Sequence, residues 1–218
     1  MDGKFGRDPS RFVLTSAYML PLEKFKSGKN KGVYKLRPDG NRVYTCFTSD
    51  FFLEEADPYR HEAWRAIRSR SDLHFYIPTK RIRRFLDCSP SDWADGYENV
   101  TIACTTENQD MADNRLPYFA SLPIKHREII VEPILERIDI RAHLSGIEQV
   151  IVGGESGDDA RICDFQWIFA LYRQCLDAQV PFRFKQTGAR FINERNILVN
   201  VARMHQQRLA ARYRLNPA

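Results

Sequence analysis

The stretch REIIVEPILERIDIRAHLSGIEQVIVGGESG, residues 127–157, contains two short apolar runs, and each run ends in polar, Gly or Pro residues. Near-continuous runs of Val and Ile are typical of strands that are covered on both faces, as in a parallel sheet. Similar runs recur along the chain, two of them strong and two weaker: VYTCFTSDFF at 43–52, VTIACTTEN at 100–108, LHFYIPTKR at 73–81 and PFRFKQTGARF at 181–191. The chain therefore has about six candidate parallel strands.

Helical patterns lie between these runs. Asp57 and Pro58 precede HEAWRAIRSR with a cap-and-proline start, and Asp164 precedes FQWIFALYRQCLDAQ. Strands that alternate with helices predict repeated βα units, and hence an α/β fold with a partial (βα) barrel of the TIM type or a doubly wound sheet. The spacing does not decide between the two.

Length and composition predict one core with additional segments at both ends. The chain has 218 residues, of which 43% are hydrophobic, and a formal net charge of +5. We expect an N-terminal arm or hairpin at 1–42, the barrel domain at 43–192 and a basic, helix-compatible tail at 193–218 that carries several arginines. The sequence has no apolar run long enough to cross a bilayer and no signal-peptide pattern, which favours the cytoplasm.

The five cysteines are odd in number and widely spaced, at positions 46, 88, 104, 163 and 175. None forms a C-x-x-C pair, so we expect neither disulfides nor a metal site. Cys46 and Cys104 lie in strand-like runs and are expected to be buried.

The carboxyl ends of parallel strands meet at one edge, where α/β folds bind ligands. The polar and glycine residues that close each apolar run are therefore the candidates for a site, and Thr48, Ser49 and Lys80 are among the residues at predicted strand ends. The predicted site itself consists of Asp50, Glu107, Asn108, Glu132, Gly153, Gly154, Glu155, Ser156 and Lys185. We expect the carboxylates to share one cleft and to repel, which raises at least one pKa unless a lysine neutralises them. Alternatively, these residues cap helices and form ion pairs, and the Gly-Gly-Glu-Ser-Gly string is either an anion-binding backbone or a tight turn.

Taken in order, VYTCFTSDFF, TKRI, VTIACTTENQDMADNRLP, LPIKHREIIVEPILERIDI, IEQVIVGGESGDDARICDFQW and VPFRFKQTGARF resemble a phage- and bacteria-associated family of radical-SAM-like proteins of unknown function. The resemblance covers about residues 43–192 and implies a partial barrel of the radical SAM type. Fuller members carry, upstream of the part seen here, a cysteine cluster ending in C-x-x-C-Y that would hold a [4Fe–4S] centre and S-adenosyl-L-methionine. The resemblance implies that Glu107, Glu132, Glu155 and Lys185 face such a ligand, and that Met1 lies beyond the cysteine segment.

We therefore predict a radical-SAM-like barrel with an unknown small-molecule substrate, inactive in this chain and binding none of these cofactors, because the cysteine motif is absent. One alternative is a non-redox acid/base or phosphate-handling enzyme that uses Glu132 or Glu155 as a base. Another is an accessory protein that binds nucleic acid through the basic tail and the lysine-rich N-terminal arm, although the net charge signals such a partner only weakly.

Overall fold

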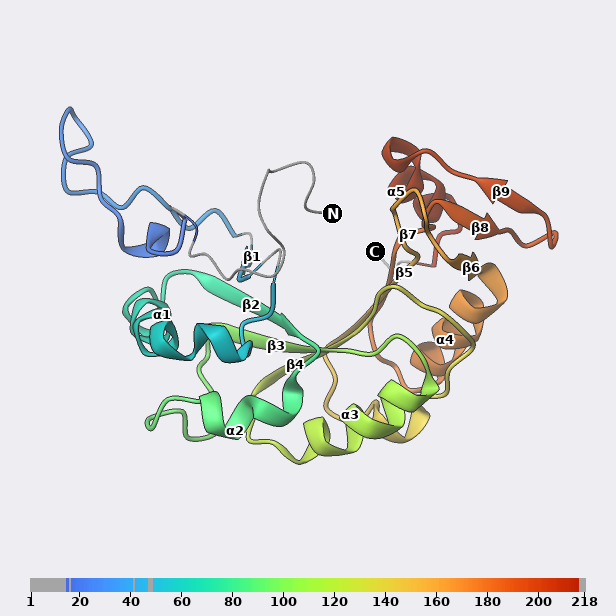
Figure 1. Ribbon diagram of the computed structural model, residues 1–218, viewed down its shortest axis with the longest axis horizontal. Coiled ribbons are helices and arrows are strands. Elements are labelled where there is room, and N and C mark those ends of the chain that lie inside the picture. Colours follow the sequence, from blue (N-terminus) through green and yellow to red (C-terminus); the bar gives the residue numbers. More distant parts are fainter. Residues whose placement is uncertain (1–14, 16, 41, 47–48, 216–218) are drawn as a thin grey trace.

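A curled sheet of six strands forms the centre of the computed structural model, which describes residues 15, 17–40, 42–46 and 49–215 (Figure 1). Neighbouring strands are all parallel, and their order in the sheet is their order along the chain. The strands are β1 (Arg42–Tyr44), β2 (His74–Thr79), β3 (Val100–Thr105), β4 (His126–Val131), β5 (Gln149–Gly153) and β7 (Phe182–Gln186). A doubly wound sheet reverses its strand order at a switch point. The observed order therefore excludes that alternative and confirms the predicted partial barrel.

The first predicted strand is much shorter than expected. β1 ends at Tyr44, and the Thr45 amide makes a last bond to the Tyr76 carbonyl, 3.0 Å away. Cys46 then adopts a φ of 48° and its side chain is exposed, so the prediction of a buried strand cysteine is wrong at this position. A left-handed residue cannot continue a strand, and the chain turns instead, with the Ser49 amide bonded to the Cys46 carbonyl. Thr48 lies outside the described residues.

Four helices lie on one side of the sheet (Figure 1). They are α1 (Asp57–Ser69), α2 (Phe85–Cys88), α3 (Gln109–Ser121) and α4 (Phe165–Asp177). The Asp164 carboxylate accepts a bond of 2.8 Å from the Gln166 amide, which confirms the predicted start of α4. Asp57 is not a cap, because Ala56 holds that position and the Asp57 carboxylate pairs with Arg84 instead.

The connection from β4 to β5 differs from the predicted strand–helix alternation. It contains a single turn of 3-10 helix, η5 (Arg141–His143), and the described chain has no α-helix there. Short 3-10 turns also precede α1 and α2, η3 (Glu54–Ala56) and η4 (Ile82–Arg84). None of the helices in the described ranges is long and apolar enough to cross a membrane.

The two faces of the sheet differ in chemistry. Alternate residues such as Phe75, Ile102 and Ile129 belong to the main core, which also includes residues of the helices. On the other face, a small cluster of Tyr76, Ala103 and Ile151 forms separately.

A buried charge links the strands on this second face. The Glu128 carboxylate is fully buried in β4, where it accepts a bond of 2.8 Å from the Tyr76 hydroxyl. Arg42 reaches it from β1 at 2.5 Å, with its guanidinium 4.8 Å from the centre of the Tyr76 ring. Burial, followed by the charge of Glu128, raises the pKa of Tyr76. Three residues from three strands thus hold the short edge strand β1 in place.

The two ends of the chain add smaller units. In the arm, Lys24 and Tyr34 form an antiparallel bridge, and the buried Arg70 donates to the Leu36 carbonyl at 2.8 Å. η2 (Leu20–Leu22) also belongs to the arm. A second sheet contains β6 (Ile162–Asp164), β8 (Arg190–Ile192) and β9 (Leu198–Asn200), and α5 (Arg203–Arg212) lies beside β7 (Figure 1). The segment expected as a basic tail thus supplies β9 and α5, while the division into three parts stays a prediction.

The close packing at Gly154 yields a stability test. A Cβ atom there would lie 2.4 Å from the Thr187 carbonyl oxygen and 2.8 Å from the Cys163 Cβ, whereas a Cβ at Gly157 would meet nothing within 4 Å. We expect Gly154→Ala to lower the free energy of unfolding by about 1–3 kcal/mol, because backbone must move to make room. Gly157→Ala serves as the matched control and should change it by less than about 0.5 kcal/mol. Urea denaturation measures both, and equal effects would contradict the packing role.

Candidate functional site

Several of the predicted site residues lie at the carboxyl edge of the sheet, and Glu132, Gly153 and Lys185 are direct neighbours there. Glu132 directly follows β4, and a Cβ atom on Gly153, the last residue of β5, would lie 3.1 Å from the Glu132 Oε1 atom. Glu107 follows β3, and Lys185 lies in the last part of β7. Residues scattered over more than half of the chain are therefore neighbours, because parallel strands bring their carboxyl ends to one edge.

Asp50 supports this edge through three hydrogen bonds. Its carboxylate accepts from the Thr79 hydroxyl at 2.8 Å, the Lys80 amide at 2.8 Å and the Phe52 amide at 3.0 Å. The residue is 8% exposed. With its oxygens occupied by donors at the end of β2, Asp50 is suited to fixing the loop after β1 rather than to contacting a ligand.

Glu107 lies between two basic side chains. Its Oε1 atom pairs with the Lys80 Nζ atom, and its Oε2 atom accepts a bond of 2.9 Å from Arg115 on α3. Arg115 also donates to the Thr105 carbonyl at 2.6 Å, so it links the helix to the end of β3. Arg115 was not among the residues predicted for the site. Its position seven residues, or two helical turns, after Asn108 is the signal that could have indicated it.

Glu132 and Lys185 form the second pair, with 2.7 Å between the Glu132 Oε2 and Lys185 Nζ atoms. The lysine side chain is 40% exposed and that of the glutamate 19%, so the pair lies where a ligand from solvent could reach it. Gly153 allows the carboxylate to approach the backbone closely, since a Cβ atom there would be 3.1 Å from both Glu132 and Gln186.

Glu155 is held by Arg161 in a bidentate ion pair. The Arg161 Nε and Nη2 atoms lie 2.9 and 3.0 Å from the two carboxylate oxygens, and the Arg161 amide donates at 3.0 Å. These bonds hold the pKa of Glu155 below its usual value, and the charge of Lys80 lowers it further. The expected repulsion is thus compensated by two lysines, Lys80 and Lys185, and by two arginines, Arg115 and Arg161. No pattern in the sequence indicated Arg161.

Two other predicted site residues have structural roles. The Asn108 side chain accepts a bond of 2.9 Å from the Met111 amide, which makes it the N-cap of α3. The Gly154 amide donates to the Gln186 carbonyl at 3.0 Å, so it is not available to a phosphate. The close approach of two backbones explains this glycine. None of Gly153, Gly154 and Gly157 has a positive φ, so a tight turn that needs glycine dihedrals does not account for the Gly-Gly-Glu-Ser-Gly string. Ser156 is half-buried in the loop that follows.

The cysteines do not suit an iron–sulfur cluster. Four of the five are buried, and they lie on α2, β3, β6 and α4. In the described part of the chain, no group of three His, Cys, Asp or Glu side chains could hold a metal ion. A cuboidal cluster requires three or four thiolates at one place, and these residues do not supply them.

Comparison with known proteins gives one match. The model of a family described as a protein of unknown function (DUF5131) matches residues 15–213, nearly the whole chain. Neither the curated proteins nor the solved structures include a match.

Asp50 allows a test of the edge itself. Asp50→Ala would leave the buried Thr79 hydroxyl and the Lys80 and Phe52 amides without their acceptor, so we expect it to lower the free energy of unfolding by about 1–3 kcal/mol. Asp87→Ala removes an exposed carboxylate from α2 and is the control, with an expected change of less than about 0.5 kcal/mol. Urea denaturation distinguishes the two, and a stability equal to that of the control would refute the supporting role.

The thiols allow a second test. Burial raises the pKa of Cys104, Cys163 and Cys175 to about 12 and also raises that of Cys88. Buried thiols with high pKa values react slowly. Desolvation raises the pKa of Cys46 as well, but its side chain is exposed. With Ellman's reagent at neutral pH, we expect one thiol to react in the folded protein and the other four on unfolding. Cys46→Ser should abolish the early reaction, and an early reaction that persists in this variant would contradict the assignment.

Proposed function

The chain belongs to the DUF5131 family of proteins of unknown function, and from that premise we propose that its half-barrel binds a small zwitterionic molecule at the carboxyl edge of the sheet. The observation that carries the proposal is the ion pair between Glu132 and Lys185. A ligand with an ammonium group and a carboxylate can replace this pair charge for charge, with the ammonium on Glu132 and the carboxylate on Lys185.

The surroundings of the pair support a ligand of the amino-acid type. Gly153 lets Glu132 and Gln186 pack closely against β5, and the Gln186 side-chain amide donates to the Gly154 carbonyl at 2.8 Å, which fixes one wall. Glu107 and Glu155 follow the neighbouring strands and can accept hydrogen bonds from hydroxyl groups. Both carboxylates are already oriented by arginines, so their side chains lose little conformational freedom when a ligand binds.

S-Adenosyl-L-methionine is the specific ligand that we propose, and this proposal replaces the prediction from the sequence that the chain binds no such cofactor. Its amino-acid end is the zwitterionic part that would replace the pair of Glu132 and Lys185. Its ribose hydroxyls would face Glu107 or Glu155, and these carboxylates would also attract the additional positive charge of its sulfonium. The ligand agrees with the resemblance to phage-associated radical-SAM-like proteins. When bound beside an iron–sulfur cluster, this cofactor supplies radical chemistry. The described residues do not fit such a cluster, so we derive no redox step, and the proposal concerns binding of the cofactor by this cytoplasmic half-barrel.

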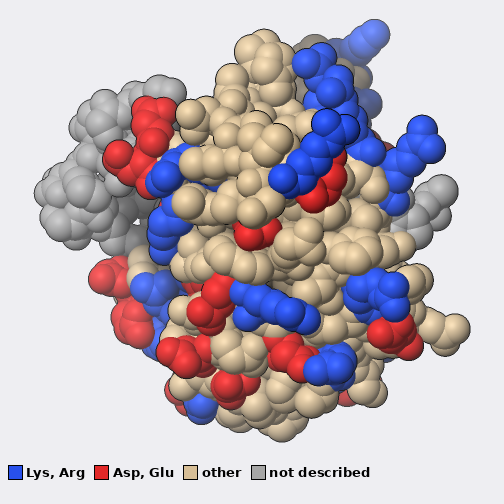
Figure 2. Space-filling model, turned by 90° about the vertical axis from the view of Figure 1, so that its right-hand side faces the viewer, with Lys and Arg blue, Asp and Glu red and all other residues tan. Residues whose placement is uncertain are grey.

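The two alternatives have less support. A general base works best when its pKa is near the ambient pH, and Arg161 shifts the pKa of Glu155 in the opposite direction. A nucleic-acid interface is usually a continuous basic surface. On the face that Figure 2 shows, Lys and Arg side chains gather at the upper right, but lower on this face they are mixed with Asp and Glu side chains, so the basic surface is not continuous.

Titration calorimetry with S-adenosyl-L-methionine and with free methionine tests the proposal. We expect Lys185→Met and Glu132→Gln each to weaken binding of both molecules by about tenfold or more, because each removes a hydrogen bond to a charged group. Lys125→Met is the matched control, since Lys125 forms an ion pair with Glu98 before β4, at the opposite edge of the sheet.

The control should bind as the unchanged protein does, and circular dichroism should show that all variants are folded. Binding by neither molecule, or equal binding by Lys185→Met and the control, would refute the proposed site. Binding of S-adenosyl-L-methionine without any effect of Glu132→Gln would place its amino group elsewhere.

A further inference from the structure

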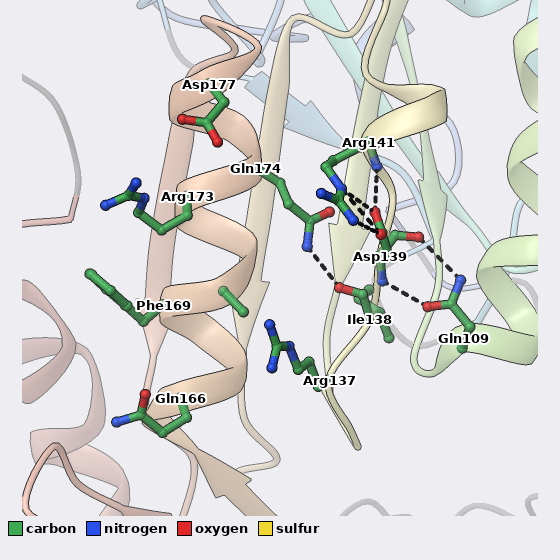
Figure 3. A pocket seen from close by; sticks show the side chains of 11 residues that line it. Gln109, Arg137, Ile138, Asp139, Arg141, Gln166, Phe169, Arg173, Gln174 and Asp177 are labelled. Atoms are coloured by element: carbon green, nitrogen blue, oxygen red, sulfur yellow. Dashed lines mark hydrogen bonds and ion pairs between the residues drawn. The ribbon is translucent and has the colours of Figure 1, made fainter.

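A pocket of about 520 Å³ lies on the helical side of the sheet, and its lining contains none of the charged edge residues described above (Figure 3). It is bounded by α4 and by the loop of residues 137–141, with Gln109 at the start of α3. Pockets for small molecules usually enclose about 300–1,000 Å³. The volume therefore suits a metabolite-sized ligand.

Two glutamines hold the loop wall of this pocket rigidly. The Gln109 side-chain amide donates to the Asp139 backbone carbonyl at 3.1 Å and accepts from the Asp139 backbone amide at 2.7 Å. The Gln174 side-chain amide donates to the Ile138 backbone carbonyl at 2.9 Å (Figure 3) and accepts from the Ile140 backbone amide at 2.8 Å. Such a wall does not have to be ordered when a ligand arrives.

The charge balance of the pocket favours an anion. Arg141 is paired with Asp139 at 3.0 Å and is therefore neutralised. Among the described residues, Arg137 on the loop and Arg173 on α4 make no hydrogen bond or ion pair, and both are exposed. Three arginines against two aspartates, Asp139 and Asp177, leave one excess positive charge in the lining.

Phe169 adds a flat apolar surface one helical turn before Arg173. Its ring is stacked on Phe165, with 5.9 Å between the ring centres and 24° between the planes, yet the residue remains 37% exposed. An aromatic ring that is supported on one side and exposed on the other is suited to stacking against a planar group.

We propose that this pocket binds a nucleotide, with the phosphate group between Arg137 and Arg173 and the base against Phe169. A phosphate monoester carries about −1.5 to −2 charges at pH 7, so it can engage two guanidinium groups where a carboxylate would balance only one. The planar guanidinium also matches phosphate oxygens in a bidentate arrangement. This site is independent of the proposed function at the carboxyl edge.

Calorimetry with AMP, adenosine and inorganic phosphate, at low ionic strength, tests the site. We expect AMP to bind more tightly than either fragment. The double variant Arg137→Gln, Arg173→Gln should weaken AMP binding by at least about tenfold, because it removes two charged donors. The matched control is Arg203→Gln, Arg212→Gln on α5, which removes the same charge from two exposed arginines and should bind AMP as the unchanged protein does.

Three outcomes would overturn the proposal. They are no AMP binding at millimolar concentrations, adenosine binding as tight as that of AMP, and equal AMP binding by the two double variants. Phe169→Ala should weaken binding of AMP but not of inorganic phosphate, and the reverse result would also contradict it. Lys185→Met should leave AMP binding unchanged, so the failure of either site is distinguishable from the failure of the other.

Discussion

The parallel register of six strands in chain order is the constraint on which the other features depend. Because each strand pairs with its predecessor in the same direction, every carboxyl end reaches the same edge, and the polar residues that follow the strands become neighbours. The helices then have one face of the sheet to cover (Figure 1). The Glu128, Tyr76 and Arg42 contacts extend this order to β1, whose three residues could contribute little pairing energy alone.

Charge pairing decides how the edge can work. Each of Glu107, Glu132 and Glu155 has a basic partner, so the edge is electrostatically balanced without a ligand. A ligand with one charge would break a pair and leave a partly buried partner uncompensated. A zwitterion would not, because it supplies both signs. The pairing therefore supports the proposal of a zwitterionic ligand over a simple anion, and it argues against a cation site, which three carboxylates alone would indicate.

Much of the fold could be predicted from the sequence, because strands that are buried on both faces have near-continuous apolar runs. The run at 43–52 was predicted as one strand, but β1 ends at Tyr44. Phe51 and Phe52 lie in the loop after β1 and are nevertheless buried in the core, so an apolar run alone does not distinguish a strand from a buried loop. The location of Glu107, Glu132 and Glu155 after strands was predictable for the same reason, because each follows an apolar run. Their partners were not, because Arg115 and Arg161 come from a helix and a loop whose approach depends on packing. Gly154 shows the same limit, because its neighbour Thr187 is distant in sequence.

The loop after β4 contributes residues both to the carboxyl edge and to the pocket beside α4, so the two proposed sites share one structural element. Its first part carries Glu132, and the Ile134 and Leu135 amides donate to the Gly153 and Glu107 carbonyls at 2.9 and 3.0 Å. Its second part is held by Gln109 and Gln174. Coupling between two sites requires an element with two arrangements of similar energy. A loop fixed by backbone hydrogen bonds at both ends favours one arrangement, and ligands at the two sites should therefore bind independently.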